Sequence, residues 1–261
     1  MPSFSLSALY MNIHLKLVYV FLYVPIIVLM VLSFNKAGLP TVWSGFSLEW
    51  YGKLFENDAI LNAAGNTLIV AIISTVLASI LGTLLALGVQ KAKTNSALDA
   101  LLFAPMIIPD IVLAIALLSF FTLLEFTLGL HSIILSHVVF NIAFVCAVVR
   151  TRLKNFDYSV VEASEDLGAS SFTTFRRITL PIIFPGVLAG SLLAFTLSID
   201  EFIIAFFTAG AGASSTTLPM QIYSMIRFGV TPEINAMATI VMMVSFTLVF
   251  LSQRINKGIT G

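Results

Sequence analysis

Six long apolar stretches constrain the fold of this chain more than any other feature of its sequence. A helix that crosses the hydrocarbon core of a membrane, which is about 30 Å thick, needs about 20 predominantly apolar residues. The stretches cover residues 17–34, 68–89, 101–124, 133–149, 187–207 and 236–251, and the fourth and last are expected to extend by a residue or two at each end. We therefore expect an all-α membrane protein with six transmembrane helices.

Composition supports the same fold class. With 59% hydrophobic and 10% charged residues and a mean hydropathy of +1.03, the chain has too little polar surface to close a water-soluble globule. The first stretch is longer than a signal-peptide core of about 7 to 15 residues and lacks a cleavage site, so it is expected to be retained. No repeat or soluble domain stands out, and residues 1–261 are predicted to form a single transmembrane domain.

The distribution of Lys and Arg predicts the orientation of the chain. If the N-terminus is cytoplasmic, the inside holds Lys16, Lys91, Lys93, Arg150, Arg152, Lys154, Arg176, Arg177, Arg254 and Lys257, and the outside holds Lys36, Lys53 and Arg227. Because cytoplasmic loops carry the excess of basic residues, both termini are expected in the cytoplasm. The loop between the fourth and fifth stretches then lies on the same side.

This loop, residues 159–181, is a polar segment in an otherwise apolar sequence. Ser159 followed by Glu162 is typical of a capping box, which predicts a short helix that begins at Ser159 and ends at the left-handed residue Gly168. A second short helix is predicted to begin at Ser170 and to end before Pro181. The two helices would form a rigid elbow. Its apolar residues available to a partner are Val160, Val161, Ala163 and Leu167, with Glu162, Glu165, Asp166, Arg176 and Arg177 at the rim.

The elbow resembles a loop of known function. It reads Glu162-Ala163-Ser164, three residues, Gly168, nine residues, and Ile178-Thr179-Leu180-Pro181. This spacing resembles the coupling loop of ABC-importer permeases, which docks into the ATPase subunit. Ser164 stands where that family usually has a second Ala, and a small residue at this position is compatible with close docking. The alternative is an interfacial helix that lies on the bilayer.

Motifs for catalysis are absent from the sequence. The chain has no Gly-x-x-x-x-Gly-Lys-Ser/Thr phosphate loop, no His-Glu-x-x-His, no Gly-x-Ser-x-Gly and no Cys and His residues at metal-binding spacing. His14, His131 and His137 are far apart in sequence and are interpreted as interface or helix-packing residues. We expect a transport subunit that is not an enzyme and holds no cofactor or metal of its own.

Three carboxylates lie within the apolar stretches: Asp110, Asp200 and Glu201. A charged residue in a span costs about 2.5–3.5 kcal/mol on insertion scales and by default faces a cavity or a partner. On unbroken helices Asp110 would lie near the bilayer midplane and the other two in the outer half. Such a series suits a cation that enters from outside. For Asp110 the alternative is a polar bridge to a neighbouring helix.

Helix geometry restricts the fifth stretch further. Gly190, Ala194, Ser198 and Glu201 share one small and polar stripe, which is predicted to line a pathway. Asp200 points about 100° away from Glu201 on a regular helix. Both carboxylates therefore reach one cavity only if the helix sits at the rim of that cavity or is locally opened.

Over nearly its whole length the chain looks like the PotC-type spermidine/putrescine permeases of ABC importers. The most specific segments are Pro109-Asp110-Ile111-Val112, Leu197-Ser198-Ile199-Asp200-Glu201, Ile222-Tyr223-Ser224-Met225 and residues 229–236. The resemblance implies a multi-pass protein of the bacterial inner membrane. Its implied partners are a second permease chain, two copies of an ATPase that holds ATP and Mg, a periplasmic polyamine-binding protein and membrane lipid, but no nucleic acid.

The same resemblance carries over residue roles. The substrate-path positions are Trp50, Asp110, Ser198, Asp200 and Glu201, and for Trp50, which lies in a loop, a lipid-anchor role stays open. The ATPase-coupling positions are Glu162, Ala163, Ser164, Gly168, Ile178, Leu180 and Pro181. The competing functions are an ABC permease for ferric ion or another organic cation, a secondary transporter or channel, which needs no docking elbow, and an intramembrane hydrolase, for which no nucleophile or metal set is found.

Overall fold

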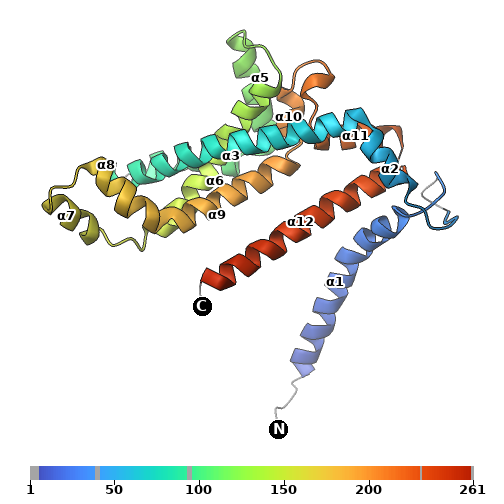
Figure 1. The fold of residues 1–261 in the computed structure, drawn as a ribbon, viewed down its shortest axis with the longest axis horizontal. Helices are drawn as coiled ribbons and strands as arrows, with labels where there is room; N and C mark the ends of the chain where they lie inside the picture. The colour runs from blue at the N-terminus through green and yellow to red at the C-terminus, as the bar shows by residue number, and fades with distance from the viewer. Residues whose placement is uncertain (1–5, 39–41, 93–95, 230, 260–261) are drawn as a thin grey trace. The chain divides into compact units, whose positions relative to one another are not determined.

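The computed structural model describes residues 6–38, 42–92, 96–229 and 231–259, so Lys93 and Val230 lie outside the described residues. Within these ranges the chain is almost entirely helical, and an isolated bridge between Asn35 and Phe46 is the β structure present. The helices, shown in Figure 1, are α1 (Leu6–Leu32), α2 (Glu49–Glu56), α3 (Asp58–Ala92), α4 (Ser96–Ile107), α5 (Asp110–Leu123), α6 (Leu130–Leu153), α7 (Ser159–Asp166), α8 (Ser171–Thr174), η1 (Phe175–Thr179), α9 (Leu180–Asp200), α10 (Ile203–Thr208), η2 (Ala213–Ser215), α11 (Leu218–Phe228) and α12 (Pro232–Ile259). The all-α prediction is confirmed.

Among the described residues, four segments are long and apolar enough to cross a membrane as single helices: Ile13–Leu32, Asp58–Gln90, Leu130–Leu153 and Ser171–Asp200. A fifth crossing is possible if the bent pair Ala97–Ile107 and Asp110–Leu123 counts as one span. The apolar part of α12, Pro232–Val244, is shorter. The count of six spans stays a prediction.

The chain divides into two compact units, Met1–Leu61 with Ile222–Gly261, and Asn62–Gln221. In the first unit, α12 packs against α1 and α2. The Asn57 amide donates a hydrogen bond of 3.1 Å to Glu233 at the start of α12, and the Ser33 and Tyr51 hydroxyls lie 2.7 Å apart. These contacts hold the polar connection after α1 to the helices that follow it.

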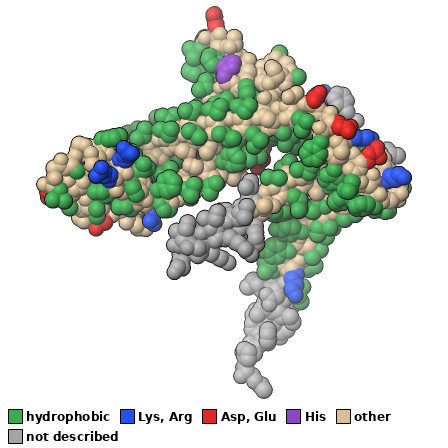
Figure 2. Space-filling model, in the orientation of Figure 1, with side chains coloured by type: hydrophobic (Ala, Val, Ile, Leu, Met, Phe, Trp, Pro, Cys, Tyr) green, Lys and Arg blue, Asp and Glu red, His purple; other side chains and the backbone are tan. Residues whose placement is uncertain are grey.

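In the second unit, α6 packs against α9, and glycines let neighbouring helices approach closely. A Cβ added to Gly82 of α3 would lie 2.8 Å from the Cβ of Val145 on α6, and one added to Gly190 of α9 would lie 3.3 Å from the Cα of Val145. Small residues at such crossings maximise van der Waals contact where lipid removes the hydrophobic driving force between helices. Figure 2 shows hydrophobic side chains over most of the visible helical surface, as a lipid-facing protein requires.

The stretch 101–124 is not the single helix expected from the sequence. It forms α4 and α5, which are bent by 102° around Ile108 and Pro109. Pro109 disfavours a helical conformation at the residue before it and has no N–H to continue the hydrogen-bond ladder. The prediction that Asp110 lies on a straight helix is therefore wrong.

The segment after the elbow also differs from expectation. Ser170 caps α8, because its hydroxyl accepts a hydrogen bond of 3.3 Å from the N–H of Thr173, but the helix does not end before Pro181. It continues through the π-turn η1 into α9, with Pro181 in the first turn of α9. A π-turn shifts the hydrogen-bond pattern from i→i+4 to i→i+5, and at the start of the next helix the missing N–H of proline costs least.

Candidate transport site and coupling loop

The helix of the fifth apolar stretch breaks at its two carboxylates, Asp200 and Glu201. Asp200 is the last residue of α9, Glu201 is extended (φ −66°, ψ 121°), and α10 begins at Ile203. The Glu201 carboxylate accepts hydrogen bonds from the backbone N–H groups of Ile204 (2.7 Å) and Ala205 (2.9 Å). Glu201 therefore caps the first turn of α10 with its own side chain, which is 11% exposed, while Asp200 is exposed.

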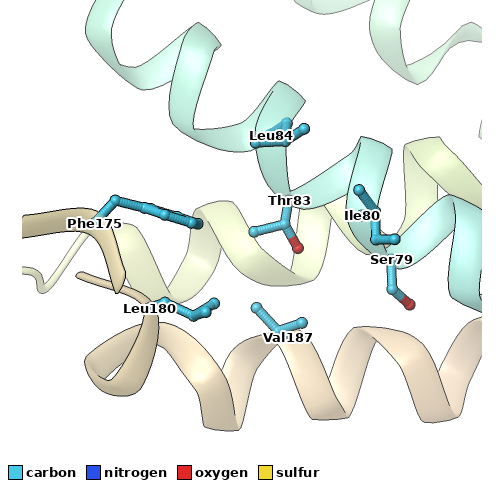
Figure 3. A pocket seen from close by; sticks show the side chains of 7 residues that line it. All are labelled: Ser79, Ile80, Thr83, Leu84, Phe175, Leu180 and Val187. Atoms are coloured by element: carbon cyan, nitrogen blue, oxygen red, sulfur yellow. The ribbon is translucent and has the colours of Figure 1, made fainter. Parts of the chain in front are cut away.

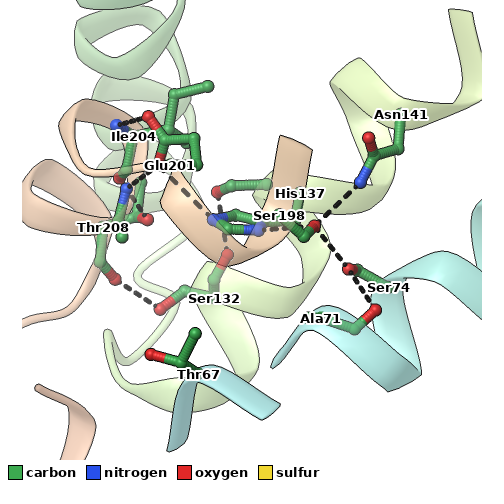
Figure 4. A network of polar contacts seen from close by, with 12 residues as sticks. Thr67, Ala71, Ser74, Ser132, His137, Asn141, Ser198, Glu201, Ile204 and Thr208 are labelled. Atoms are coloured by element: carbon green, nitrogen blue, oxygen red, sulfur yellow. Dashed lines mark hydrogen bonds and ion pairs between the residues drawn. The ribbon is translucent and has the colours of Figure 1, made fainter. Parts of the chain in front are cut away.

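We call the interruption between α9 and α10, at Glu201 and Phe202, the break. One turn before the break, Ser198 is the centre of a buried polar network (Figure 4). Its hydroxyl oxygen accepts a hydrogen bond from the amide of Asn141 on α6 (3.0 Å). It also lies 3.0 Å from the hydroxyl of Ser74 on α3 and 3.0 Å from Nδ1 of His137 on α6. Three helices of the second unit thus meet at a single hydroxyl.

His137 connects this network to the break. Its ring lies between Ser198 and Glu201, with Nε2 at 3.5 Å from the Oε2 of Glu201 (Figure 4). The His137 side chain is 1% exposed. Buried polar groups are costly unless they are paired, so a histidine buried between the Ser198 hydroxyl and the Glu201 carboxylate is part of a specific arrangement.

The structure separates residues that the sequence placed together. The stripe of Gly190, Ala194 and Ser198 is buried within the second unit, and Gly190 packs on Val145 of α6. That this stripe lines a pathway stays a prediction. The unbroken-helix direction of Glu201 is wrong, because the helix ends before it. The local opening that the sequence analysis left as an alternative is what the structure shows.

The two remaining substrate-path candidates lie elsewhere. Asp110 is exposed. Because it is the first residue of α5, the positive end of the helix dipole stabilises its negative charge. Trp50 belongs to the first unit, and its indole N–H donates to the carbonyl of Asn35 (2.9 Å). The ammonium of Lys53 lies 4.4 Å from the centre of the Trp50 ring, which shows that this ring accommodates a cation on its face. Lys53 also pairs with Glu49 at 2.8 Å.

Sequence reasoning missed His137 and Asn141 as parts of this site. Both were visible as polar residues four positions apart in the apolar stretch 133–149, which places them on one helix face. Their partner Ser198 lies 61 and 57 residues away in sequence, so the pattern alone does not reveal the connection. No group of three or more His, Cys, Asp or Glu side chains suited to a metal occurs among the described residues.

The elbow begins with a cap other than the one predicted. Ser159 lies inside α7 and Tyr158 precedes the helix without a side-chain cap, so the predicted capping box is wrong. Asp157 fills this role, since its carboxylate accepts from the N–H of Ser159 at 3.0 Å. Hydrogen bonds from the hydroxyl and the backbone of Ser159 lower the pKa of Asp157 below its ordinary value, and the negative charge suits a helix N-terminus.

The end of α7 is the one that the sequence predicted. Gly168 has φ +82°, its N–H donates to the carbonyl of Glu165 (2.9 Å), and the N–H of Ala169 donates to the carbonyl of Ser164 (3.1 Å). These two bonds form a Schellman motif, which requires a left-handed residue at the position of Gly168.

The faces of α7 differ in part from the prediction. Val161 packs on the core of the second unit, and Ser164 is buried with its hydroxyl 3.0 Å from that of Thr174. Ser164 therefore ties α7 to α8, and its part in coupling to an ATPase stays a prediction. Leu167 (89% exposed) and Phe172 (71% exposed) form the apolar outer surface of the elbow.

The other coupling positions differ in their surroundings. Glu162, Ala163, Gly168 and Pro181 are exposed, whereas Ile178 and Leu180 are half-buried. Figure 3 shows Leu180 beside an apolar pocket of about 290 Å³, together with Phe175, Val187 and side chains of α3. Because α8 continues through η1 into α9, the second half of the elbow is continuous with the helix that carries Ser198 and Asp200.

Comparison with known proteins decides the family. Residues 78–257 match the family model of the binding-protein-dependent transport system inner membrane component. The chain belongs to this family. It is a transport subunit, the inner-membrane permease of an ABC transporter.

Several relatives of this permease cover nearly its whole length. It is 43% identical to the spermidine/putrescine transport system permease protein PotC of Escherichia coli K12 (94% of each chain) and 41% identical to the PotC of Haemophilus influenzae (94% of this chain, 96% of the relative). It is 40% identical to the putrescine transport system permease protein PotI of Escherichia coli K12 (93% of this chain, 90% of the relative).

Solved structures support the fold. A chain of a bacterial ABC transporter involved in the import of the acidic polysaccharide alginate matches with a TM-score of 0.72 at 14% identity, covering 98% of this permease and 99% of that chain. A chain of the MetNI methionine ABC transporter matches with a TM-score of 0.60 at 19% identity, covering 80% and 97%. At these identities the likeness concerns the fold alone.

Proposed function

We propose that this permease moves polyamines, spermidine or putrescine, across the bacterial inner membrane as part of an ATP-driven importer. The observation that carries the proposal is the exposed carboxylate of Asp200 where a membrane-spanning helix breaks. An acidic group in a span by default serves a cation path or a partner. The relatives that are 40–43% identical are polyamine permeases by name, and spermidine and putrescine are flexible chains of ammonium groups.

The two adjacent carboxylates take different roles in this proposal. Asp200 is free to replace part of the water that an ammonium group loses. Glu201 is engaged by the amides of Ile204 and Ala205 and fixes the break that presents Asp200. Asp110, at an exposed helix start, is a second point of contact for the cation, and Trp50 offers a ring face that already accommodates the Lys53 ammonium.

Energy enters through the elbow. The permease holds no ATP or Mg of its own, and two copies of a partner ATPase supply them. Leu167 and Phe172 pack on that ATPase, with Glu162, Ala163, Gly168 and Pro181 nearby. Because Ser164 bonds to Thr174 and the helix continues through η1 into α9, a displacement of α7 reaches the break at Asp200 through one connected element.

The proposed assembly contains a second permease chain and a periplasmic polyamine-binding protein. The excess of Lys and Arg on one side of the spans supports cytoplasmic termini and a cytoplasmic elbow. The binding protein then delivers the cation on the side where α9 ends.

The test is uptake by the complete complex in proteoliposomes. Labelled spermidine and putrescine are offered with the binding protein outside and the ATPase subunits facing ATP and Mg. We expect accumulation that requires both ATP and the binding protein, and no accumulation of ferric ion. Accumulation of ferric ion but not of polyamines, or uptake of polyamines without ATP, would contradict the proposal.

A further inference from the structure

We infer that His137 is a positioning residue of the transport site, which acts through Glu201 to hold the break that presents Asp200. The inference rests on the proposed function only where polyamine uptake is the quantity measured. It starts from the geometry of a buried ring between two partners on either side of the break, the Ser198 hydroxyl before it and the Glu201 carboxylate after it.

The hydrogen bonds of Ser198 restrict the protonation of this ring. Ser198 accepts from Asn141 and has one O–H to donate. If the neutral ring carries its proton on Nε2, Ser198 donates to Nδ1, and the Nε2–H faces Glu201. Ser74 then donates its one O–H to Ser198 (3.0 Å) and gives up the longer bond to the Ala71 carbonyl (3.4 Å). If the proton is on Nδ1, the Nε2 lone pair points at a carboxylate 3.5 Å away, which is repulsive. The geometry therefore favours the Nε2–H form of the neutral ring.

The surroundings of Nε2 leave it no other role. The atom is buried and makes no hydrogen bond within the described part of the chain, so the Glu201 carboxylate is the acceptor that it faces. The Oε2 of Glu201 accepts a hydrogen bond from the N–H of Ala205, which lies in the first turn of α10. The ring thus faces, at 3.5 Å, the same oxygen that accepts from α10, and loss of the ring frees Glu201 to turn and the break to change shape.

Two conservative substitutions separate the two ends of the ring. His137→Gln places an amide nitrogen near the position of Nε2 and keeps a donor for Glu201, whereas His137→Asn places its amide near Nδ1 and keeps only the partner of Ser198. In the complete complex we expect His137→Gln to retain most of the maximal rate of ATP-driven polyamine uptake. We expect His137→Asn to lose about tenfold, the equivalent of one charge-assisted hydrogen bond.

A double-mutant cycle tests whether the effect passes through Glu201. In a Glu201→Gln background, His137→Asn should cause little further loss, because its partner has already changed. Equal losses for His137→Gln and His137→Asn, or additive losses in the double mutant, would overturn the inference, since a residue that only fills space gives both results.

A spectroscopic arm does not depend on the substrate. The nitrogen-15 resonances of His137, taken as the difference between histidine-labelled complexes with and without His137→Gln, should show a protonated Nε2 and an unprotonated Nδ1. A ring protonated on Nδ1 alone would refute the assignment whatever the uptake of the variants. If the wild-type complex moved no polyamine, the proposed function would fail, but the protonation of His137 would still be tested by its nitrogen-15 resonances.

Discussion

Gly168 provides a prediction whose magnitude follows from local geometry. A Cβ built at this residue has no atom within 4 Å, so a side chain meets no steric obstacle. The cost of a substitution therefore comes from the backbone, whose φ is +82°. A left-handed conformation costs an ordinary residue about 1–2 kcal/mol, which lowers the population of the native helix end roughly 5- to 30-fold.

Side chains differ in how well they tolerate this conformation. Asn visits the left-handed region readily, Ala less so, and a β-branched residue least. We expect ATPase co-purification and ATP-driven uptake to fall in the order Gly168, Gly168→Asn, Gly168→Ala and Gly168→Val, with uptake abolished in the valine variant. Membrane insertion should stay normal in all of them. Amide hydrogen exchange at Ala169 should accelerate in the same order, because its bond to Ser164 closes the motif.

A matched control uses a glycine with an ordinary helical backbone. Gly88 in α3 also has open space around a built Cβ but no positive φ. There Ala is favoured over Gly by about 1 kcal/mol, so Gly88→Ala should stabilise or leave the complex unchanged. If Gly168→Val showed normal co-purification and uptake, both the Schellman motif as the determinant of the elbow and its docking role would be refuted.

Further substitutions test the roles of Asp110, Gly82 and Trp50. Asp110→Asn should lower uptake while expression and ATPase association persist, and unchanged uptake would remove its substrate role. Gly82→Ala places a Cβ 2.8 Å from a neighbouring side chain, so it should destabilise the complex by about 1–3 kcal/mol in thermal unfolding, whereas Gly65→Ala, which meets nothing within 4 Å, should not; equal Tm values would contradict the packing argument. Trp50→Phe keeps a cation-binding ring and should retain more uptake than Trp50→Ala, and equal loss in both would point to the indole N–H instead.

The sequence predicted those features that depend on local pattern. Apolar length predicted where the long apolar helices lie, although the count of six spans is not confirmed. Gly168 predicted the end of α7, and Ser170 predicted the cap of α8. Each follows from residues within one or two turns. The position of Asp110 at a helix end was missed and that of Asp200 and Glu201 was left as an alternative, because apolar composition continues unchanged across the breaks at Pro109 and Glu201.

What the sequence could not predict depends on contacts between distant segments. Ser164 reads as a small docking residue until its hydroxyl is seen beside Thr174. His137 reads as a packing residue until Ser198 and Glu201 are seen on either side of its ring. In both cases the side chain has a polar atom that burial obliges to find a partner, and only the fold identifies which partner it finds.

The most direct test of the central claim is the initial rate of ATP-driven polyamine uptake by the complete complex carrying Asp200→Asn. The substitution keeps the shape of the exposed side chain at the end of α9 and removes its charge. The account predicts a severe loss of uptake with normal assembly and normal ATPase association, while Asp58→Asn, which removes one exposed charge at the start of α3, stays near wild type. Near-normal uptake with Asp200→Asn would contradict the claim that the break after α9 presents a carboxylate to the moving cation.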